Sequence, residues 1–209
     1  MKWLNRAVTL LIGLVPVFWM AQVKNERQKR WFDKLWQGAW LKEGYAQPEN
    51  IQTIAEHYRE FDSHSVDLLL YFLFIPIGTI RLILNSQNVS VPVLRDFQVK
   101  GDWDPEQVLE ITLLSVLPKF QGRSHIASLF LMRGFYRYAK KHNLRWAVIA
   151  ADRRLYVMLK RIFIVEKLGE GLVYEGSLTI PACIDLDAQE AQLPTRNPKL
   201  YQFFTKGRL

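Results

Sequence analysis

Glu110 is a charged residue in an apolar part of the chain. It lies between Leu109 and Ile111, inside the run of residues 108–117. A carboxylate with apolar neighbours is a stronger base than one in water, so Glu110 is a candidate general base that accepts a proton directly or through a water molecule. Two structural alternatives remain for this residue: it could face solvent at the end of a strand, or it could pair with Arg81.

Arg81 is the second charged residue of this kind, inside the apolar segment of residues 78–84. Its planar guanidinium can hold a carboxylate through two parallel hydrogen bonds, which makes it a candidate clamp for a substrate carboxylate. The alternative is a structural salt bridge to Asp62 or to Glu110.

A third feature is the turn of residues 118–123, which joins the run containing Glu110 to a long amphipathic segment at residues 124–142. Backbone amides at the start of a helix bind phosphate groups, so a strand, a turn and a helix in this order can form an anion site. His125 would lie beside such a phosphate and could help to bind it.

Other kinds of chemistry have little support in the sequence. None of the 4 histidines follows a recognisable nucleophile motif with Ser or Cys, which argues against a covalent triad. No zinc-ligand spacing is present, and no metal is expected. Cys183 is the single cysteine, so it forms no internal disulfide, and it stands in an apolar strand where an inert thiol is expected.

The formal net charge of +8 suits nucleic acid, an anionic membrane surface or an acidic protein. No RNA-binding signature or leucine heptad is present, so no nucleic-acid partner is expected. The basic residues fall mainly on two predicted helices, where they form either a solvated face or a docking site for an acidic protein: Arg133, Arg137, Lys140, Lys141, Arg153, Arg154, Lys160 and Arg161.

The elements that must position these residues follow from periodicity and turn signals. Helices are expected at residues 25–43, stopped by Gly44, and at 49–60. A helix capped by Asp152 is expected to run to residue 161. Strands are expected at residues 66–74, 78–84, 89–99, 108–117, 144–150, 164–168, 171–174 and 178–186. The unit of strand, turn, long helix and strand predicts that residues 108–117 and 144–150 run parallel.

The order of these elements resembles the GNAT fold of acyltransferases, and residues 108–123 resemble its central strand and pantetheine-binding turn. Further segments resemble the branch that contains the autoinducer (acyl-homoserine lactone) synthases and the N-acyl amino acid synthases. They are Glu60-Phe61-Asp62, Gly78-Thr79-Ile80-Arg81-Leu82, and Tyr174-Glu175-Gly176-Ser177 followed by Pro181 and Ile184-Asp185-Leu186. The resemblance covers residues 30–187.

This resemblance implies an α/β fold with a mostly antiparallel central sheet, in which one parallel strand pair splays apart to seat the pantetheine arm. It implies an N-acyltransferase with Glu110 as catalytic base and with Arg81 and Asp62 binding the acceptor. It also implies that the donor is held by Leu114, Ser115, Val116, Gln121, Gly122, Arg123, Ser124 and His125. No cofactor is expected beyond the acyl-phosphopantetheine co-substrate.

The donor turn departs from the pattern of enzymes that use coenzyme A. Gln121 and Gly122 are kept, but Ser124 and Ile126 replace two later small residues, and their side chains would crowd a pyrophosphate. Acyl carrier protein presents its pantetheine through a single phosphate, so it is favoured as donor and partner. An acetyl-CoA-dependent N-acetyltransferase of the same fold is the alternative, and a membrane-tethered binding module without enzymatic activity is a third reading.

The acceptor side departs from the homoserine lactone synthases. Those enzymes carry an arginine three residues after the strand glutamate, where this chain has Leu113. An arginine of their first helix is also missing, since Lys34-Leu35-Trp36 stands there. An ordinary or aromatic amino acid is therefore the expected acceptor, and the expected product is a long-chain N-acyl amino acid.

The chain is divided into a hydrophobic amino-terminal helix at residues 1–24, an acyltransferase domain at 25–190 and a tail at 191–209. Residues 7–23 carry no charge and are followed by Lys24, Arg27, Lys29 and Arg30. Such a segment could lie on or cross the cytoplasmic membrane, with the domain in the cytoplasm. The alternative is a helix that packs on the domain or on a partner subunit.

Overall fold

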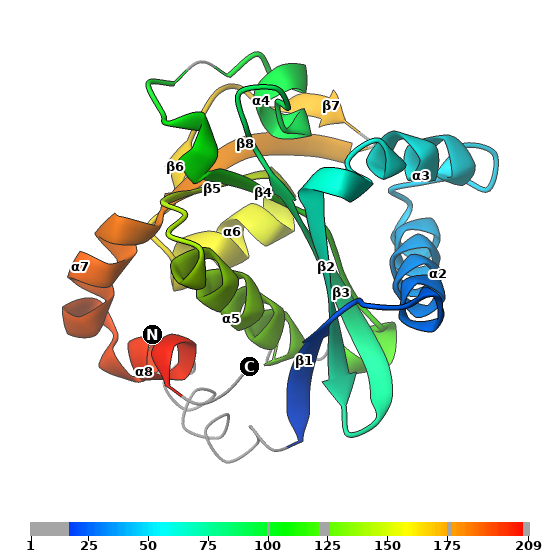
Figure 1. The fold of residues 1–209 in the computed structure, drawn as a ribbon, viewed down its shortest axis with the longest axis horizontal. Helices are drawn as coiled ribbons and strands as arrows, with labels where there is room; N and C mark the ends of the chain where they lie inside the picture. The colour runs from blue at the N-terminus through cyan, green and yellow to red at the C-terminus, as the bar shows by residue number, and fades with distance from the viewer. Residues whose placement is uncertain (1–16, 100, 122–125, 175–176, 207–209) are drawn as a thin grey trace.

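The apolar runs form a single central sheet (Figure 1). The computed structural model describes residues 17–99, 101–121, 126–174 and 177–206. Within these residues the sheet has eight strands in the order β1-β2-β3-β4-β5-β8-β6, and β7 pairs with β8. The strands are β1 (Phe18–Gln22), β2 (Ser65–Phe72), β3 (Ile75–Leu84), β4 (Val108–Val116), β5 (Trp146–Asp152), β6 (Glu166–Lys167), β7 (Leu172–Tyr174) and β8 (Ser177–Asp185).

The pairing of β4 with β5 confirms the predicted parallel crossover. Residues 108–110 pair with residues 146–148 in parallel, while the other strand pairs of the described residues are antiparallel. Both strands continue beyond this short ladder, to Val116 and Asp152, without pairing to each other. The mostly antiparallel α/β fold with one splayed pair is therefore the predicted one.

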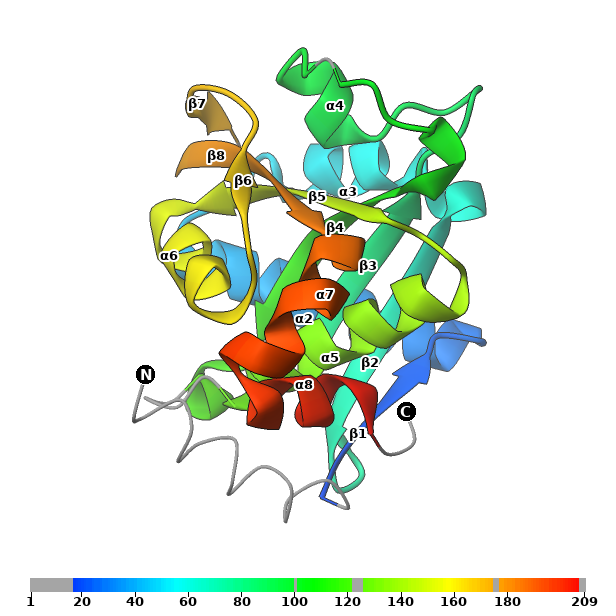
Figure 2. The same ribbon diagram turned by 90° about the vertical axis from the view of Figure 1, so that its left-hand side faces the viewer.

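Helices cover both faces of the sheet (Figure 2). One hydrophobic core lies between the sheet and α2 (Glu26–Glu43), α3 (Ile51–Arg59) and α4 (Pro92–Asp96). The other lies on the opposite face, under α5 (Ile126–Lys141), α6 (Arg153–Ile162), α7 (Leu186–Arg196) and α8 (Pro198–Thr205). The sheet thus separates two helical layers. Side chains of the two layers can meet where β4 and β5 splay apart.

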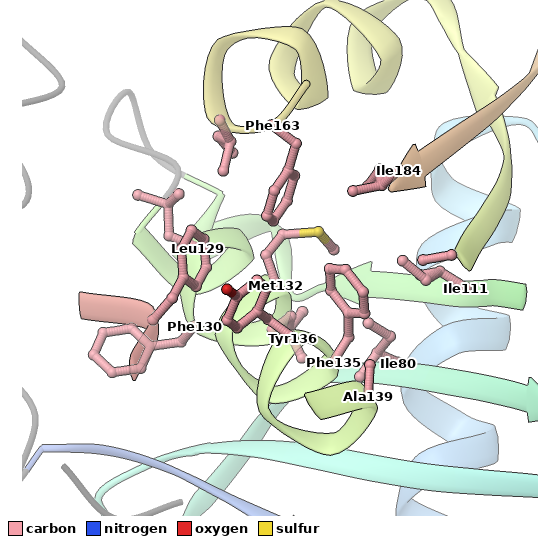
Figure 3. Packing of buried hydrophobic residues seen from close by; sticks show 14 of the residues in the cluster. Ile80, Ile111, Leu129, Phe130, Met132, Phe135, Tyr136, Ala139, Phe163 and Ile184 are labelled. Atoms are coloured by element: carbon pink, nitrogen blue, oxygen red, sulfur yellow. The ribbon is translucent and has the colours of Figure 1, made fainter. Parts of the chain in front are cut away.

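Helix α5 anchors the second core (Figure 3). Its apolar face packs Leu129, Met132 and Phe135 among residues of the sheet and of α6, including Ile111 and Phe163. Gly134 of the same helix lies against β1: a Cβ atom added there would come within 2.3 Å of the Met20 sulfur. The helix that follows the donor turn is therefore fixed closely against the sheet.

The helix boundaries follow the predicted signals. Asn25 accepts a hydrogen bond from the Gln28 amide at 3.0 Å at the start of α2, and the helix ends at Gly44, whose φ of 80° is in the left-handed region. Asp152 caps α6 by accepting from the Leu155 amide at 2.6 Å. The predicted stop at Gly44 and the predicted cap at Asp152 are both confirmed.

Two predictions about the amino-terminal half are wrong. The predicted helix at residues 1–24 is wrong over Phe18–Gln22, which form strand β1, because these residues complete the sheet edge along β2 and bury Phe18 against Phe130 at 4.9 Å between ring centroids. The earlier residues, 1–16, lie outside the described part of the chain. The predicted strand at 89–99 is instead the short helix α4, with Pro92 in its first turn.

The predicted tail at 191–209 is also folded as far as it is described. Helices α7 and α8 pack on α5, and Phe203 and Phe204 are buried in the second core. None of the helices in the described residues combines the length and apolar character that crossing a bilayer requires.

Candidate active site

A cavity of about 500 Å³ opens where β4 and β5 separate. Its floor is β4 from Glu110, the last residue that pairs with β5, to Val116, and one wall is the end of β5, with Ile149, Ala150 and Asp152. Further lining residues come from both helical layers: Ala39, Trp40, Tyr45 and Tyr58 on the α2 side, and Ser128, Leu129, Leu155, Met158 and Ile162 on the α5 and α6 side. The cavity therefore connects the two faces of the sheet.

Strand β4 is bulged in the middle of the cavity. The register with β3 shifts between Thr79 and Arg81, so that two residues of β4 lie opposite Ile80. Leu113 takes a φ of 48°, and its carbonyl accepts a hydrogen bond from the Thr79 hydroxyl at 2.8 Å. Such a bulge re-aims backbone groups out of the ladder, which suits a strand that must polarise a bound carbonyl group.

Three of the predicted donor residues line the cavity next to this bulge: Leu114, Ser115 and Val116. The Ser115 hydroxyl is buried and has no hydrogen-bond partner among the described residues. A buried unsatisfied hydroxyl is costly, so this atom fits a polar group of a ligand such as a pantetheine amide. The orphaned hydroxyl supports the predicted role of Ser115.

Gln121 also lines the cavity and closes the end of β4. Its side-chain amide donates to the Val116 carbonyl at 2.8 Å, after the short 3-10 turn Pro118–Phe120. The other predicted donor residues, Gly122, Arg123, Ser124 and His125, lie outside the described part of the chain. Their roles stay predictions.

Glu110 is a buried carboxylate in the lining of the cavity. It is 2% exposed, and it is the last residue of β4 that pairs with β5. One carboxylate oxygen, Oε2, accepts from the Val93 amide of α4 at 2.7 Å. The burial of Glu110 excludes the alternative in which this residue faces solvent. The segment around Pro92, predicted as a strand, instead forms helix α4, and its Val93 amide holds the Glu110 carboxylate.

Two residues beside Glu110 escaped prediction. The Thr112 hydroxyl donates to the Tyr58 hydroxyl at 3.1 Å, and both side chains line the cavity. Alternation along β4 places Thr112 on the same face as Glu110, and that signal was readable from the sequence. Tyr58 comes from α3, far away in the chain, and carried no such signal.

A second polar pair lies at the far end of the cavity. The Tyr45 hydroxyl donates to Asp152 Oδ2, which joins the end of α2 to the end of β5. Burial and the hydrogen bond to Asp152 raise the pKa of Tyr45, so the phenol remains a neutral donor. Glu43 of α2 and Arg154 of α6 also line the cavity and act electrostatically on Tyr45, so both negative and positive groups surround this pair.

Arg81 is occupied by residues of the chain itself. It is 2% exposed; its Nε donates to Asp67 Oδ1 at 2.6 Å, its Nη2 to Asp67 Oδ2 at 2.8 Å and its Nη1 to the Tyr58 carbonyl at 2.7 Å. Burial opposes the charged form, but the carboxylates of Asp67 and Asp62 outweigh it and raise the pKa of Arg81. The guanidinium therefore binds the carboxylate of Asp67, a partner that the sequence did not indicate.

Asp62 completes this ion pair, with Oδ1 at 2.8 Å from Arg81 Nη2. The structural alternative for Arg81, a salt bridge to Asp62, is the arrangement observed. Arg81 and Asp62 are absent from the described cavity lining, so their geometry gives acceptor binding no support. Through the Tyr58 carbonyl, Arg81 instead holds α3 against the sheet and so positions the Tyr58 ring.

We expect Cys183 to resist alkylation in the folded protein. The residue is 2% exposed, and burial, with a smaller contribution from Glu166 and Asp185, raises the pKa of its thiol to about 12. Iodoacetamide at about pH 8 should therefore label the chain only after unfolding in guanidinium, because the thiolate is the reactive form. Mass spectrometry checks this, and stoichiometric labelling of the native protein would contradict it.

Comparison with known proteins places this geometry in a family. The family described as N-acyl amino acid synthase FeeM matches residues 32–184 of the chain. Among curated proteins, none matches it in sequence. The solved structure of FeeM, an N-acyl amino acid synthase from uncultured soil microbes, aligns with a TM-score of 0.62 and 14% identity over 84% of this chain and 94% of that one.

Two acyl-homoserine lactone synthases share the fold. BjaI, a CoA-dependent enzyme solved with SAM and isopentyl-CoA, aligns with a TM-score of 0.59 and 16% identity over 91% of each chain. LasI aligns with a TM-score of 0.56 and 12% identity over 81% of this chain and 89% of its own. The family match extends over most of the sheet, from α2 through β8, and the chain belongs to the N-acyl amino acid synthase family of FeeM.

Proposed function

We propose that this N-acyltransferase moves a long acyl chain from acyl carrier protein to the amine of an amino acid. The observation that carries the proposal is the cavity at the splay, which reaches both faces of the sheet and has Glu110 on its floor. Two substrates can enter such a cavity from opposite sides and meet at β4. An acyl thioester and an amine would then react without a covalent enzyme intermediate.

The two halves of the cavity differ in the way that these substrates require. The side under α5 and α6 contains the apolar side chains of Leu129, Met158 and Ile162, and Ser128, Arg154 and Arg161 lie in the same lining. The side under α2 carries Trp40, Tyr58 and the Tyr45–Asp152 pair. The first surface suits an acyl chain, and the second offers aromatic rings and paired polar groups to an amino acid.

The reaction needs a base and a site for negative charge. The neutral amine attacks the thioester carbonyl, and a C–N bond forms while the proton on nitrogen passes to Glu110. The carbonyl oxygen, negative in the transition state, is stabilised by the bulged backbone of β4 near Leu114. The C–S bond then breaks, and the pantetheine sulfur leaves as a thiolate that takes up a proton and becomes the free thiol of the carrier.

The preference for a carrier protein rests on charge at the cavity mouth. Helix α6 exposes four cationic side chains, Arg153, Arg154, Lys160 and Arg161. Arg154 and Arg161 line the cavity, beside the exposed Val157. A basic helix with an apolar residue beside the donor half offers complementary charge to an acidic carrier protein.

The proposal is tested with the purified full-length chain, a mixture of amino acids and either acyl carrier protein or coenzyme A as donor, each carrying the same acyl chains. Mass spectrometry should detect long-chain N-acyl amino acids, with acyl carrier protein giving the higher kcat/KM. A preference for acetyl-CoA would support the acetyltransferase alternative instead. If no acylated product is detected with either donor, the proposed activity is refuted.

We expect Met158→Trp to shorten the acyl chains that the enzyme accepts. Met158 lines the donor half of the cavity, and the larger indole would displace several methylene groups, each of which gains about 0.8 kcal/mol on burial. The kcat/KM for long-chain donors should fall by about tenfold or more relative to short-chain donors. Gln192→Trp, at an exposed position of α7 outside the cavity lining, is the matched control, and an equal loss for all chain lengths in Met158→Trp would contradict the assignment.

A further inference from the structure

The tip of the hairpin between β2 and β3 exposes three consecutive large apolar side chains. Leu73 is 49% exposed, Phe74 88% and Ile75 50%. Leu73 has a φ of 53°, so the turn itself projects these side chains outward. Isolated apolar residues are common on protein surfaces, but a contiguous exposed group marks an interaction site.

Val17, the residue directly before β1, is hydrogen-bonded to this tip. The Leu73 amide donates to the Val17 carbonyl at 2.8 Å. In sequence, residues 7–16 contain no charge and are mostly aliphatic. Figure 1 shows the start of β1 and the β2–β3 turn at the same end of the molecule. The uncharged sequence is therefore linked to the domain at Val17, next to the exposed apolar side chains of the tip.

Positive charge and aromatic rings border the same end. Phe72, the last residue of β2, packs on Phe120 at 5.3 Å between ring centroids, and the exposed Lys119 lies beside that ring. Trp19 of β1 is 39% exposed and stacks on Tyr71. Lys2 and Arg6 add two cations to the sequence ahead of the uncharged stretch. Apolar side chains with aromatic and cationic neighbours are typical of surfaces that enter the headgroup region of a bilayer.

We propose that the β2–β3 tip, defined as Leu73, Phe74 and Ile75, binds the surface of an anionic lipid bilayer. The tip inserts its apolar side chains between lipids, and the neighbouring Lys119 contacts lipid headgroups. Binding depends on exposed apolar area and on charge, so it strengthens with anionic lipid and weakens with salt.

This surface lies close to the cavity. Gly78 pairs with Val116, which lines the cavity, and Ile75 precedes Gly78 by three residues, a distance of about 10 Å along an extended strand. A bilayer bound at the tip would receive an acylated product near the place where it forms. That consequence rests on the proposed function, whereas the lipid contact does not.

The test is co-sedimentation of the full-length chain with vesicles of phosphatidylglycerol and phosphatidylethanolamine, and with vesicles of phosphatidylcholine alone. We expect binding to the anionic vesicles that falls with added salt. Phe74→Ser should weaken it by about tenfold, since one large apolar side chain no longer enters the bilayer. The matched control is Val173→Ser on β7, a residue 80% exposed at the opposite end of the molecule, which should leave binding unchanged.

Failure of the wild-type chain to bind anionic vesicles would overturn the proposal. So would equal binding by wild-type and Phe74→Ser protein, because residues 1–16 would then act without the tip. Circular dichroism and thermal unfolding of both variants verify that the fold is kept. Because the assay contains no acyl donor, its result is independent of the enzymatic activity.

Discussion

Replacing Glu110 by Gln is expected to lower turnover by about 10²–10⁴-fold while leaving the fold intact. The amide has the shape of the carboxylate, and its oxygen can still accept the hydrogen bond that Val93 donates to Glu110 at 2.7 Å. It cannot take the proton that the attacking amine must lose. Single-turnover kinetics with a bound acyl donor measure the chemical step directly.

The matched control is Glu106→Gln. Glu106 is an exposed carboxylate close in sequence, and it accepts a hydrogen bond from the Gln87 amide at 3.3 Å. Its variant should keep wild-type turnover and the wild-type pH profile. The Glu110 variant should instead lose the acidic limb of the pH profile of kcat, because the titrating base is gone. Wild-type rates in Glu110→Gln would leave this residue with the structural task of holding α4.

The central architecture could be predicted because it depends on local periodicity. Local periodicity predicts the secondary structure of three segments: the apolar run around Glu110, the amphipathic segment after the turn and the strand before Asp152. The order of these segments then implies the parallel crossover. The strand that carries Glu110 and its parallel pairing follow from that order. The family resemblance added the splay, the donor residues at 114–116 and the roles of these residues.

The edges of the fold could not be read in the same way. The uncharged stretch at residues 7–23 has no period that separates a membrane helix from a strand, and the decision for Phe18–Gln22 comes from pairing with β2. The segment around Pro92 is apolar enough for a strand, but it forms a short helix whose Val93 amide bonds to Glu110. In both places tertiary contacts override local preference.

The site residues that escaped prediction share one property: their partners are distant in the chain. Tyr58 reaches Thr112 across 54 residues, and Tyr45 reaches Asp152 across 107. Arg81 illustrates the same limit, since its partner Asp67 stands across the β2–β3 ladder, on the face of β2 that also carries the buried Leu69 and Tyr71. A guanidinium in a buried strand predicts a carboxylate partner, but the sequence does not indicate whether that carboxylate belongs to a substrate or to the protein.

Arg81→Ala is therefore expected to act on stability first. The variant leaves Asp67, whose side chain is 9% exposed, without its two-bond partner, and it removes the donor that holds the Tyr58 carbonyl. Breaking a buried pair by removing one member costs about 3–5 kcal/mol, because the remaining charge stays desolvated. The Lys29 ammonium, 3.0 Å from Asp67 Oδ2, still neutralises part of that charge, so the lower end of this range is expected. Urea unfolding followed by circular dichroism measures the change in free energy of unfolding.

Arg145→Ala is the matched control for the loss of an arginine ion pair. Arg145 lies 3.2 Å from Asp185 and 3.5 Å from Asp187, but its side chain is 45% exposed, so this change should cost no more than about 1 kcal/mol. Arg81→Lys then separates the two roles of Arg81. A lysine keeps the charge but cannot reproduce the planar grip on Asp67, so partial loss of stability is expected with the acceptor KM close to wild type. An Arg81→Lys protein with full stability and a raised acceptor KM would show instead that the guanidinium reaches the substrate, and Asp67 and Asp62 would then only orient it.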